Sequence, residues 1–443
     1  MGPGGSDAKI ATTDAYLRDR EFNGAVLVAD RDTVLLVHGY GVAEATSGRP
    51  IAADTIFPIG SITKVFTALA VLQLHERGLL DLDDPVSDYL PEFPDGDRIT
   101  LHHLLSHTAG VPRDLSEYAT VPDEADVEAA LAAYPGAPLA FEPGSDFLYS
   151  NLGYELLTRV IERVAGLSYE AYMQTVIFDP LGMENSGVAV EPLVDPRAAS
   201  GYVGDAESGE SVPPLHARWW KGAGGIYSTV EDLYRWERGL ANGTLLGADA
   251  LREMHTAQSA TSAVDGQGYG YGWQVIEPQR AVWHGGDMPG YHAWLVRDIE
   301  RDVTVIALSN EDSWAGRGID LIELHQRGLE IESSRLYPAV PLILGGVAVL
   351  GCLGLSLGAL YLRRRGGLRF GRPGVVRLAL QFVLPGTIAV VAVLVALDPV
   401  RSVGSWEALT IVAPALAWLS VALLLLATFL IVIAASAFVR PLD

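Results

Sequence analysis

The residues of this sequence best suited to do chemistry are a serine and a lysine three positions apart, Ser61 and Lys64. They lie between an apolar stretch at 55–60 and a run at 65–78 whose apolar residues recur at helical spacing. Residues three apart lie one turn apart on the same face of a helix. An amine in a poorly solvated place loses its proton easily and can then activate a serine hydroxyl. The segment therefore predicts nucleophilic catalysis, in which Ser61 attacks and Lys64 takes its proton.

Lysine is scarce in this chain, which adds weight to Lys64. The sequence has three lysines, Lys9, Lys64 and Lys221, beside 28 arginines. Arginine stays protonated in proteins, so it can replace a solvated lysine but not a lysine that must act as a base. A four-residue S-x-x-K pattern also arises by chance, so the hypothesis depends on partners elsewhere in the sequence.

The first candidate partners are Tyr149 and Asn151, just before a helical run at 152–165 that ends in glycine. Two residues so placed can face one cleft. A tyrosine beside a cation can carry protons, and an asparagine amide can donate to a substrate carbonyl. The alternative is that Tyr149 packs in the core and Asn151 caps the helix.

The second candidate segment is His284-Gly285-Gly286-Asp287, at the end of a short predicted strand. Glycines at a strand edge let a substrate backbone approach closely. The N–H of Asp287 can then pair with that of Ser61 to form an oxyanion hole. The alternative is a hairpin turn that leaves His284 on the surface.

The elements that must position these residues are strands at both ends of the first 330 residues and helices between them. This order indicates an α+β fold, with an antiparallel sheet that joins the two ends, flanked by helices. A helical subdomain then forms the other wall of a cleft, where Trp219 and Trp220 either line the cleft or pack in the core. The predicted strands are 22–30, 33–38, 270–276, 281–283, 291–297 and 303–309, and a further helix is expected at 320–333.

Together the three segments resemble the S-x-x-K, Y-x-N and K-T-G motifs of the penicillin-recognising serine hydrolases. Because the second motif begins with tyrosine, the sequence resembles most the branch that contains class C β-lactamases, DD-peptidases and esterases. Segments 104–112, 180–183 and 224–233 look like the same branch, and the resemblance covers about residues 20–330.

The resemblance implies a role for each matching residue. Ser61 corresponds to the nucleophile, Lys64 and Tyr149 to the general-base pair, and Asn151 to the amide that orients the substrate. His284-Gly285-Gly286, followed by Asp287, corresponds to the family's substrate-binding strand. No metal or cofactor is implied.

The third motif departs from the family pattern, because His284-Gly285-Gly286 stands in place of K-T-G. In β-lactamases the lysine and hydroxyl side chains hold the substrate carboxylate. We therefore expect hydrolysis of amides or esters through an acyl-enzyme, with β-lactam hydrolysis as an alternative. A non-enzymatic alternative is a sensor acylated once, or a wall-binding relative.

The last hundred residues predict a membrane domain. Three apolar runs, at about 339–362, 375–397 and 409–438, each reach the roughly 20 residues that cross a bilayer. We therefore expect a hydrolase domain at 1–337 and a membrane domain of three transmembrane helices at 338–443. This layout also resembles membrane-bound prodrug-activating peptidases, which remove an N-acyl-D-asparagine cap.

The arginines predict how this domain is oriented. Five arginines lie between the first two runs and Arg377 lies near the start of the second, whereas Arg401 is the only one between the second and third. Positive loops stay in the cytoplasm, so we expect the hydrolase domain to face outward from the cell membrane. Residues 1–20 contain no apolar export signal, and we expect that such a segment is missing from this sequence.

The charge of the chain excludes nucleic acid as a partner. The sequence has 31 basic and 54 acidic residues, a net charge of −23. Without the eight arginines and three acidic residues that follow residue 337, the hydrolase domain has 23 basic and 51 acidic residues, or −28. Such a surface repels polyanions, so we expect a small-molecule or peptide substrate. The single cysteine, Cys352, allows no disulfide within the chain.

Overall fold

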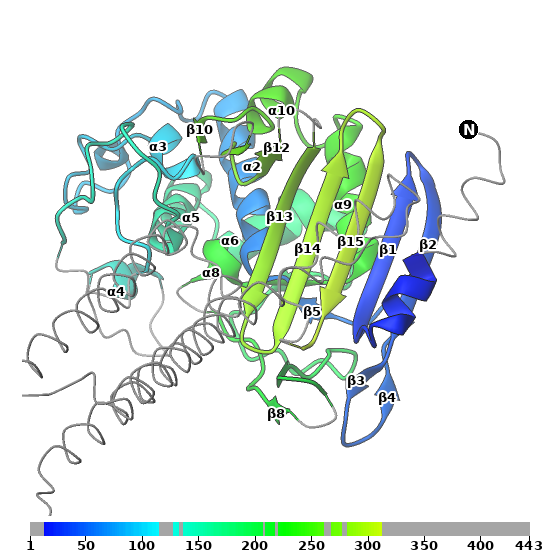
Figure 1. The fold of residues 1–443 in the computed structure, drawn as a ribbon. Coiled ribbons are helices and arrows are strands. Elements are labelled where there is room, and N and C mark those ends of the chain that lie inside the picture. The colour runs from blue at the N-terminus through cyan, green and yellow to red at the C-terminus, as the bar shows by residue number, and fades with distance from the viewer. Residues whose placement is uncertain are drawn as a thin grey trace, which may run out of the picture. The chain divides into compact units, whose positions relative to one another are not determined.

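An eight-stranded antiparallel sheet forms the centre of the molecule (Figure 1). The computed structural model describes residues 13–114, 127–132, 136–206, 209–217, 220–260, 267–276 and 281–311. The strand order is β10-β11-β12-β13-β14-β15-β1-β2. The bounds are β1 Gly24–Asp30, β2 Thr33–Tyr40, β10 Ser259–Ala260, β11 Gln267–Tyr269, β12 Gln274–Ile276, β13 Ala281–Met288, β14 Tyr291–Asp298 and β15 Val303–Ser309.

The sheet joins the two ends of this part of the chain, as predicted. β1 pairs with β15 along its whole length, from Gly24 opposite Ser309 to Asp30 opposite Val303. Side chains alternate between the two faces of a strand. Leu27 accordingly packs in the core beneath the helices, and Val28 packs in a second cluster on the other face. Both faces of β1 are therefore covered.

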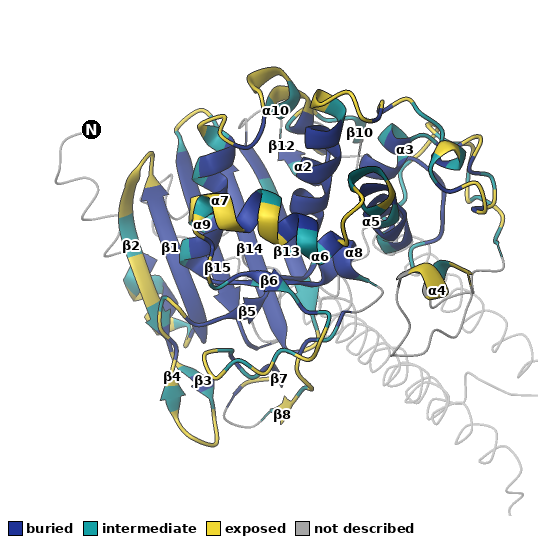
Figure 2. Cartoon of the chain, turned by 180° about the vertical axis from the view of Figure 1, so that it is seen from behind, coloured by how far each residue is buried: buried dark blue, intermediate teal, exposed yellow. Residues whose placement is uncertain are grey.

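Helices cover one face of the sheet, and Figure 2 shows α6, α7, α8 and α9 lying across it. The helix α2, Thr63–Glu76, is mostly apolar and is buried at every residue from Thr63 to Leu74, as expected for a helix enclosed by other elements. The other helices are α3 Leu101–Leu105, α4 Val127–Ala132, α5 Asn151–Ala165, α6 Tyr169–Tyr172, α7 Asp179–Leu181, α8 Lys221–Gly224, α9 Val230–Ala241 and α10 Ala248–Met254.

The predicted helical subdomain contains α3, α4 and α5 and lies beyond β13, at the left of Figure 1. Three small sheets complete the described part of the chain. Their strands are β3 Val42–Glu44 with β4 Arg49–Pro50, β5 Phe57–Pro58 with β9 Ile226–Ser228 and β6 Gly187–Val188, and β7 Tyr202–Val203 with β8 Glu210–Ser211.

Two strand predictions were wrong in their bounds by more than two residues. The predicted strand 270–276 is a strand only from Gln274 on, because the chain turns at Gly272, which has a φ of +76° and packs against the backbone of Lys64. The strand predicted at 281–283 continues to Met288, because β14 pairs with it along its whole length. His284-Gly285-Gly286 therefore lies within a strand, and the hairpin alternative is wrong.

The predicted helix at 320–333 and the three predicted membrane spans lie outside the described residues. Within the described ranges, the structure contains no helix that is both long and apolar enough to cross a bilayer.

Candidate active site

Ser61 lies in a tight turn, Gly60–Ile62, that leads directly into α2. Gly60 has a φ of +49°, a conformation that favours glycine, and its Cα faces the backbone of β13. The Ser61 side chain is partly exposed and lines a cavity of about 250 Å³. The lining residues are Gly60, Ser61, Asp114, Asn151, Leu152, Glu155, Trp220, Ala223, Gly224, Asp287 and Met288.

Lys64 lies one turn further along, with its amine against the serine. Its Nζ is 3.1 Å from Ser61 Oγ, and it donates at 2.7 Å to Asn151 Oδ1 and at 2.7 Å to the Ala223 carbonyl. The side chain is fully buried, and this loss of hydration lowers the pKa of Lys64 to about 7, against the opposing effect of the Glu155 carboxyl. A large fraction of Lys64 is therefore a neutral amine near neutral pH, able to accept the Ser61 proton.

Tyr149 lies beside both groups. Lys64 Nζ is 4.8 Å from the centre of the phenol ring. Burial raises the pKa of Tyr149 more than the interaction with the Ser61 hydroxyl lowers it, so the phenol stays neutral. His107 packs on this ring at 4.3 Å between centroids. Of the predicted general-base pair, Lys64 is thus the better base and Tyr149 the better proton carrier.

Asn151 is the first residue of α5 and points into the cavity. The cap of this helix is Ser150, whose side chain accepts from the Gly153 N–H at 2.9 Å, so the capping alternative for Asn151 is wrong. The Asn151 amide is held at both ends, because its Oδ1 accepts from Lys64 and its Nδ2 donates to Asp114 Oδ1 at 2.6 Å.

The backbone of β13 lies directly against the serine turn. A Cβ on Gly286 would collide with the Ile59 carbonyl and would stand 3.2 Å from the Ser61 nitrogen. A Cβ on Gly60 would stand 3.2 Å from the Asp287 nitrogen. The Ser61 and Asp287 nitrogens thus both lie at this contact between the serine turn and β13, where the sequence predicts an oxyanion hole.

His284 is not where the sequence analysis expected it. It is 3% exposed and does not line the cavity, and its Nε2 lies 3.1 Å from the Tyr269 hydroxyl. Burial lowers the pKa of His284 to about 3, so the ring is uncharged at neutral pH. Since β13 continues past His284, its side chain packs beneath the strand. The predicted substrate contact by His284 and Gly285 is not supported by their positions.

Sequence reasoning missed Glu155, which lies four residues after Asn151 on the same face of α5. Its Oε1 accepts the Ala223 N–H at 3.0 Å, and the Ala223 carbonyl in turn accepts a hydrogen bond from Lys64 Nζ. The signal was present, because a spacing of four from a candidate site residue at a helix start places a side chain in the same cleft.

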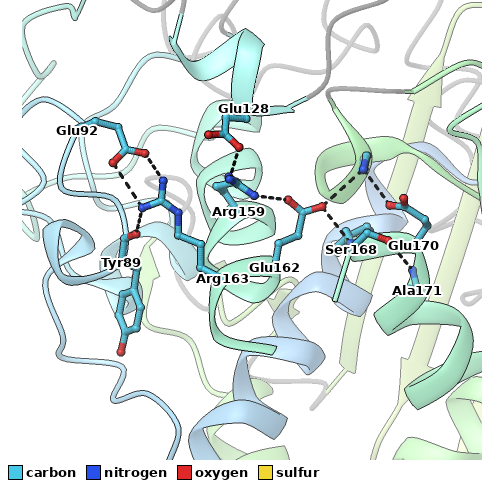
Figure 3. A network of polar contacts seen from close by, with 11 residues as sticks. Tyr89, Glu92, Glu128, Arg159, Glu162, Arg163, Ser168, Glu170 and Ala171 are labelled. Carbon is cyan, nitrogen blue, oxygen red and sulfur yellow. Dashed lines mark hydrogen bonds and ion pairs between the residues drawn. The ribbon is translucent and has the colours of Figure 1, made fainter. Parts of the chain in front are cut away.

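The turn that carries Ala223, α8, is anchored by a second buried lysine. Lys221 Nζ lies 2.8 Å from Glu170 Oε2 and 3.6 Å from Glu162 Oε1. Figure 3 shows Glu162 within a network that runs along the outer face of α5, where Arg159 and Arg163 also make ion pairs. α5 thus lines the cavity with Asn151 and Glu155, and it holds α8 through Glu155 and, two turns further along, through Glu162.

This geometry agrees with what the comparisons find. The family model described as Beta-lactamase matches residues 10–329. The chain belongs to the beta-lactamase family. The predicted resemblance to penicillin-recognising serine hydrolases, and with it the expected α+β fold, is confirmed.

The similar proteins of this family include a penicillin-binding protein, an esterase and a solved penicillin-binding protein homologue. The chain is 33% identical over 318 residues to Penicillin-binding protein 4* of Bacillus subtilis, covering 66% of this chain and 69% of that protein. It is 33% identical over 354 residues to Esterase EstB of Burkholderia gladioli, covering 68% and 89%. The octameric penicillin-binding protein homologue from Pyrococcus abyssi superimposes with a TM-score of 0.65 at 28% identity, covering 75% and 81%.

The other histidines near the site of this beta-lactamase-family protein have structural contacts. His103 completes a capping box with Thr100 at the start of α3, and His102 Nδ1 lies 2.7 Å from the Tyr271 hydroxyl. His107 Nδ1 accepts the Ser150 N–H at 3.1 Å, which holds the residue that caps α5. Among the described residues, no cluster of His, Cys, Asp and Glu is arranged to hold a metal ion. The chain is a serine hydrolase by family and by the chemistry that its side chains bring together.

Proposed function

We propose that this protein hydrolyses amide or ester bonds through an acyl-enzyme formed on Ser61, as a peptidase or an esterase. The observation that carries the proposal is the 3.1 Å contact between Ser61 Oγ and the buried Lys64 Nζ. A serine with a neutral amine at that distance is an activated nucleophile.

The residues divide the reaction between them. Lys64 takes the Ser61 proton, and Ser61 Oγ bonds to the substrate carbonyl carbon, whose oxygen accepts from the N–H groups of Ser61 and Asp287. The proton passes through Tyr149 to the leaving group as the scissile bond breaks. Water then adds to the acyl carbon, gives a proton to the same base, and releases the acid and Ser61.

Membrane anchoring and an outward-facing hydrolase domain are part of the proposal. They are supported by the three apolar runs after residue 338 and by the arginines between the first two. The test is fractionation of cells that express the full chain behind an added export signal, followed by protease treatment of intact cells. Membrane recovery with an accessible hydrolase domain is expected, and recovery in the soluble fraction contradicts the anchor.

The test of the hydrolase proposal is a panel of nitrophenyl esters, D-amino acid amides, N-acyl-D-asparagine peptides and nitrocefin. We expect turnover of at least one ester or amide, and a loss of about 10³-fold or more in Ser61→Ala. Equal activity in Ser61→Ala removes Ser61 from the mechanism. A single equivalent of acylation without turnover supports the sensor alternative.

The members of the panel separate the alternative substrates. Preferential cleavage of an N-acyl-D-asparagine peptide identifies a prodrug peptidase, and rapid nitrocefin turnover identifies a β-lactamase. We expect nitrocefin to be a poor substrate, because the K-T-G side chains are replaced and His284 is an uncharged, buried ring.

A further inference from the structure

His107 is a buried histidine that the proposed reaction does not use. It lies two residues after α3, is 1% exposed and has a φ of +59°. A left-handed backbone at a residue other than glycine costs roughly 1–3 kcal/mol and persists only where the surrounding structure holds it. The contacts that this backbone allows His107 to make therefore indicate what the residue does.

His107 holds the chain on both sides of Tyr149. Its carbonyl accepts the Leu148 N–H at 2.9 Å, and its Nδ1 accepts the Ser150 N–H at 3.1 Å. Between these two hydrogen bonds, the imidazole ring packs against the phenol ring of Tyr149, with centroids 4.3 Å apart. One residue thus fixes the backbone before Tyr149, the backbone after it and one face of its ring.

Tyr149 needs such support, because no regular structure positions it. The chain from 136 to 150 contains no helix or strand, and α5 begins only at Asn151. The phenol is therefore held beside Ser61 and Lys64 by tertiary contacts. Proton transfer requires groups within hydrogen-bond reach, so a small displacement of the phenol is enough to slow it.

The imidazole acts through Tyr149 and not as a base of its own. Nδ1 accepts a hydrogen bond only when it is unprotonated, so the neutral ring carries its proton on Nε2. That nitrogen is buried and has no hydrogen-bond partner among the described residues. Burial lowers the pKa of His107 well below its usual range, and the further groups that lower it are Lys64, His284 and Arg113. The ring therefore stays neutral in the pH range where Lys64 loses its proton.

We propose that His107 is the positioning residue of Tyr149, which it holds where the phenol can pass a proton to the leaving group. The inference rests on the proposed function and adds a residue to it. It predicts which substrates depend on His107. A p-nitrophenolate leaves without a proton, whereas the alkoxide of an ethyl ester needs one, so only the ethyl ester depends strongly on the position of Tyr149.

The test compares the p-nitrophenyl and ethyl esters of one acid, which form the same acyl-enzyme. His107→Phe keeps an aromatic ring but loses the Nδ1 acceptor. We expect it to lower kcat/KM for the ethyl ester roughly tenfold or more beyond its effect on the nitrophenyl ester, and Tyr149→Phe to shift the ratio in the same direction. In His107→Asn the ratio stays within about threefold of the wild type, because the asparagine Oδ1 replaces Nδ1 as the acceptor and asparagine tolerates a left-handed backbone.

His255→Phe is the matched control. The Nε2 of His255 is also buried without a partner among the described residues, but His255 follows α10 and packs on Trp273 with centroids 5.5 Å apart. A loss of stability lowers kcat/KM for both esters alike, so His255→Phe is expected to leave their ratio unchanged. An equal loss for both esters in His107→Phe, or a shift in His107→Asn as large as that in His107→Phe, overturns the inference.

Labelling of Ser61 with a fluorophosphonate separates this inference from the proposed function. The label bonds to the Ser61 oxygen, and we expect it on the wild type and on His107→Phe but not on Ser61→Ala. Labelling of His107→Phe together with an unchanged ester ratio overturns the positioning role and leaves the hydrolase proposal intact. Absence of labelling in the wild type overturns the proposed function, and this inference with it.

Discussion

At the scale of single residues, the site depends on burying Lys64. A lysine in water is protonated up to a pH near 10, and in that state it cannot accept the proton of a serine. Full burial moves its pKa to about 7, while the Asn151 and Ala223 oxygens keep the amine aimed at Ser61. Burial raises the pKa of Tyr149 and keeps its phenol neutral, so the two side chains take different parts in one proton transfer.

This lysine predicts the acid side of the pH profile. Below the pKa of Lys64 the amine is protonated and cannot act as a base, so kcat/KM for a neutral nitrophenyl ester falls about tenfold per pH unit below pH about 7 and levels off above it. Lys64→Arg is expected to be inactive at every pH between 6 and 9, because guanidinium stays protonated. A profile that stays flat from pH 5.5 to 7.5 contradicts Lys64 as the base.

At the scale of elements, the close approach of β13 to the serine turn controls the oxyanion hole. A methyl group on Gly286 meets the Ile59 carbonyl, whereas one on Gly285 has its nearest neighbour, the Trp283 ring, at 3.6 Å. We expect Gly286→Ala to lower kcat about 10²-fold and the free energy of unfolding by about 1–3 kcal/mol. Gly285→Ala is the matched control and is expected to change both by little. Ester hydrolysis gives kcat and urea unfolding gives the stability of both variants. Equal effects of the two variants contradict a special role for the close approach at Gly286.

The anchoring of α8 predicts a difference between a buried and an exposed ion pair. Lys221→Met leaves Glu170, whose side chain is 34% exposed, without its cation, while Glu162 keeps its ion pair with Arg159. We expect a loss of about 1–3 kcal/mol in the free energy of unfolding. Glu128→Gln breaks an ion pair with Arg159 in which the Glu128 side chain is 65% exposed, and should cost less than about 1 kcal/mol. Urea unfolding compares the two. Similar losses contradict the assignment of Lys221 as the anchor.

At the scale of the whole molecule, the net charge of −23 makes the folded protein repel itself. Salt screens this repulsion, since the Debye length falls from about 10 Å at 0.1 M to about 3 Å at 1 M. We expect the Tm of the full chain in a neutral detergent to rise over that range of NaCl. A Tm that falls with added salt shows that attractive ion pairs, such as those along α5, outweigh the repulsion.

Local patterns in the sequence were enough to predict the helices at the site, an antiparallel sheet that joins the two ends of the domain, and the candidate residues that the fold brings together. α5 ends at Gly166 because that glycine adopts a left-handed conformation, a signal visible in the sequence. Ser61 and Lys64 meet because three positions on a helix are one turn, which is also a local fact. Tyr149 and Asn151 were identified by their place before a helix.

The tertiary structure alone decided which side chains are buried and what they contact. His284 was predicted on the surface or against the substrate, but pairing of β13 with β14 carries the strand past it, and it packs beneath the sheet. Glu155 gains its role from Ala223, 68 residues away, which no local pattern predicts. Local spacing determines which side chains share one face of a helix or strand. The burial of Lys64, and with it the pKa of its amine, depends instead on elements distant in the chain that exclude water from it.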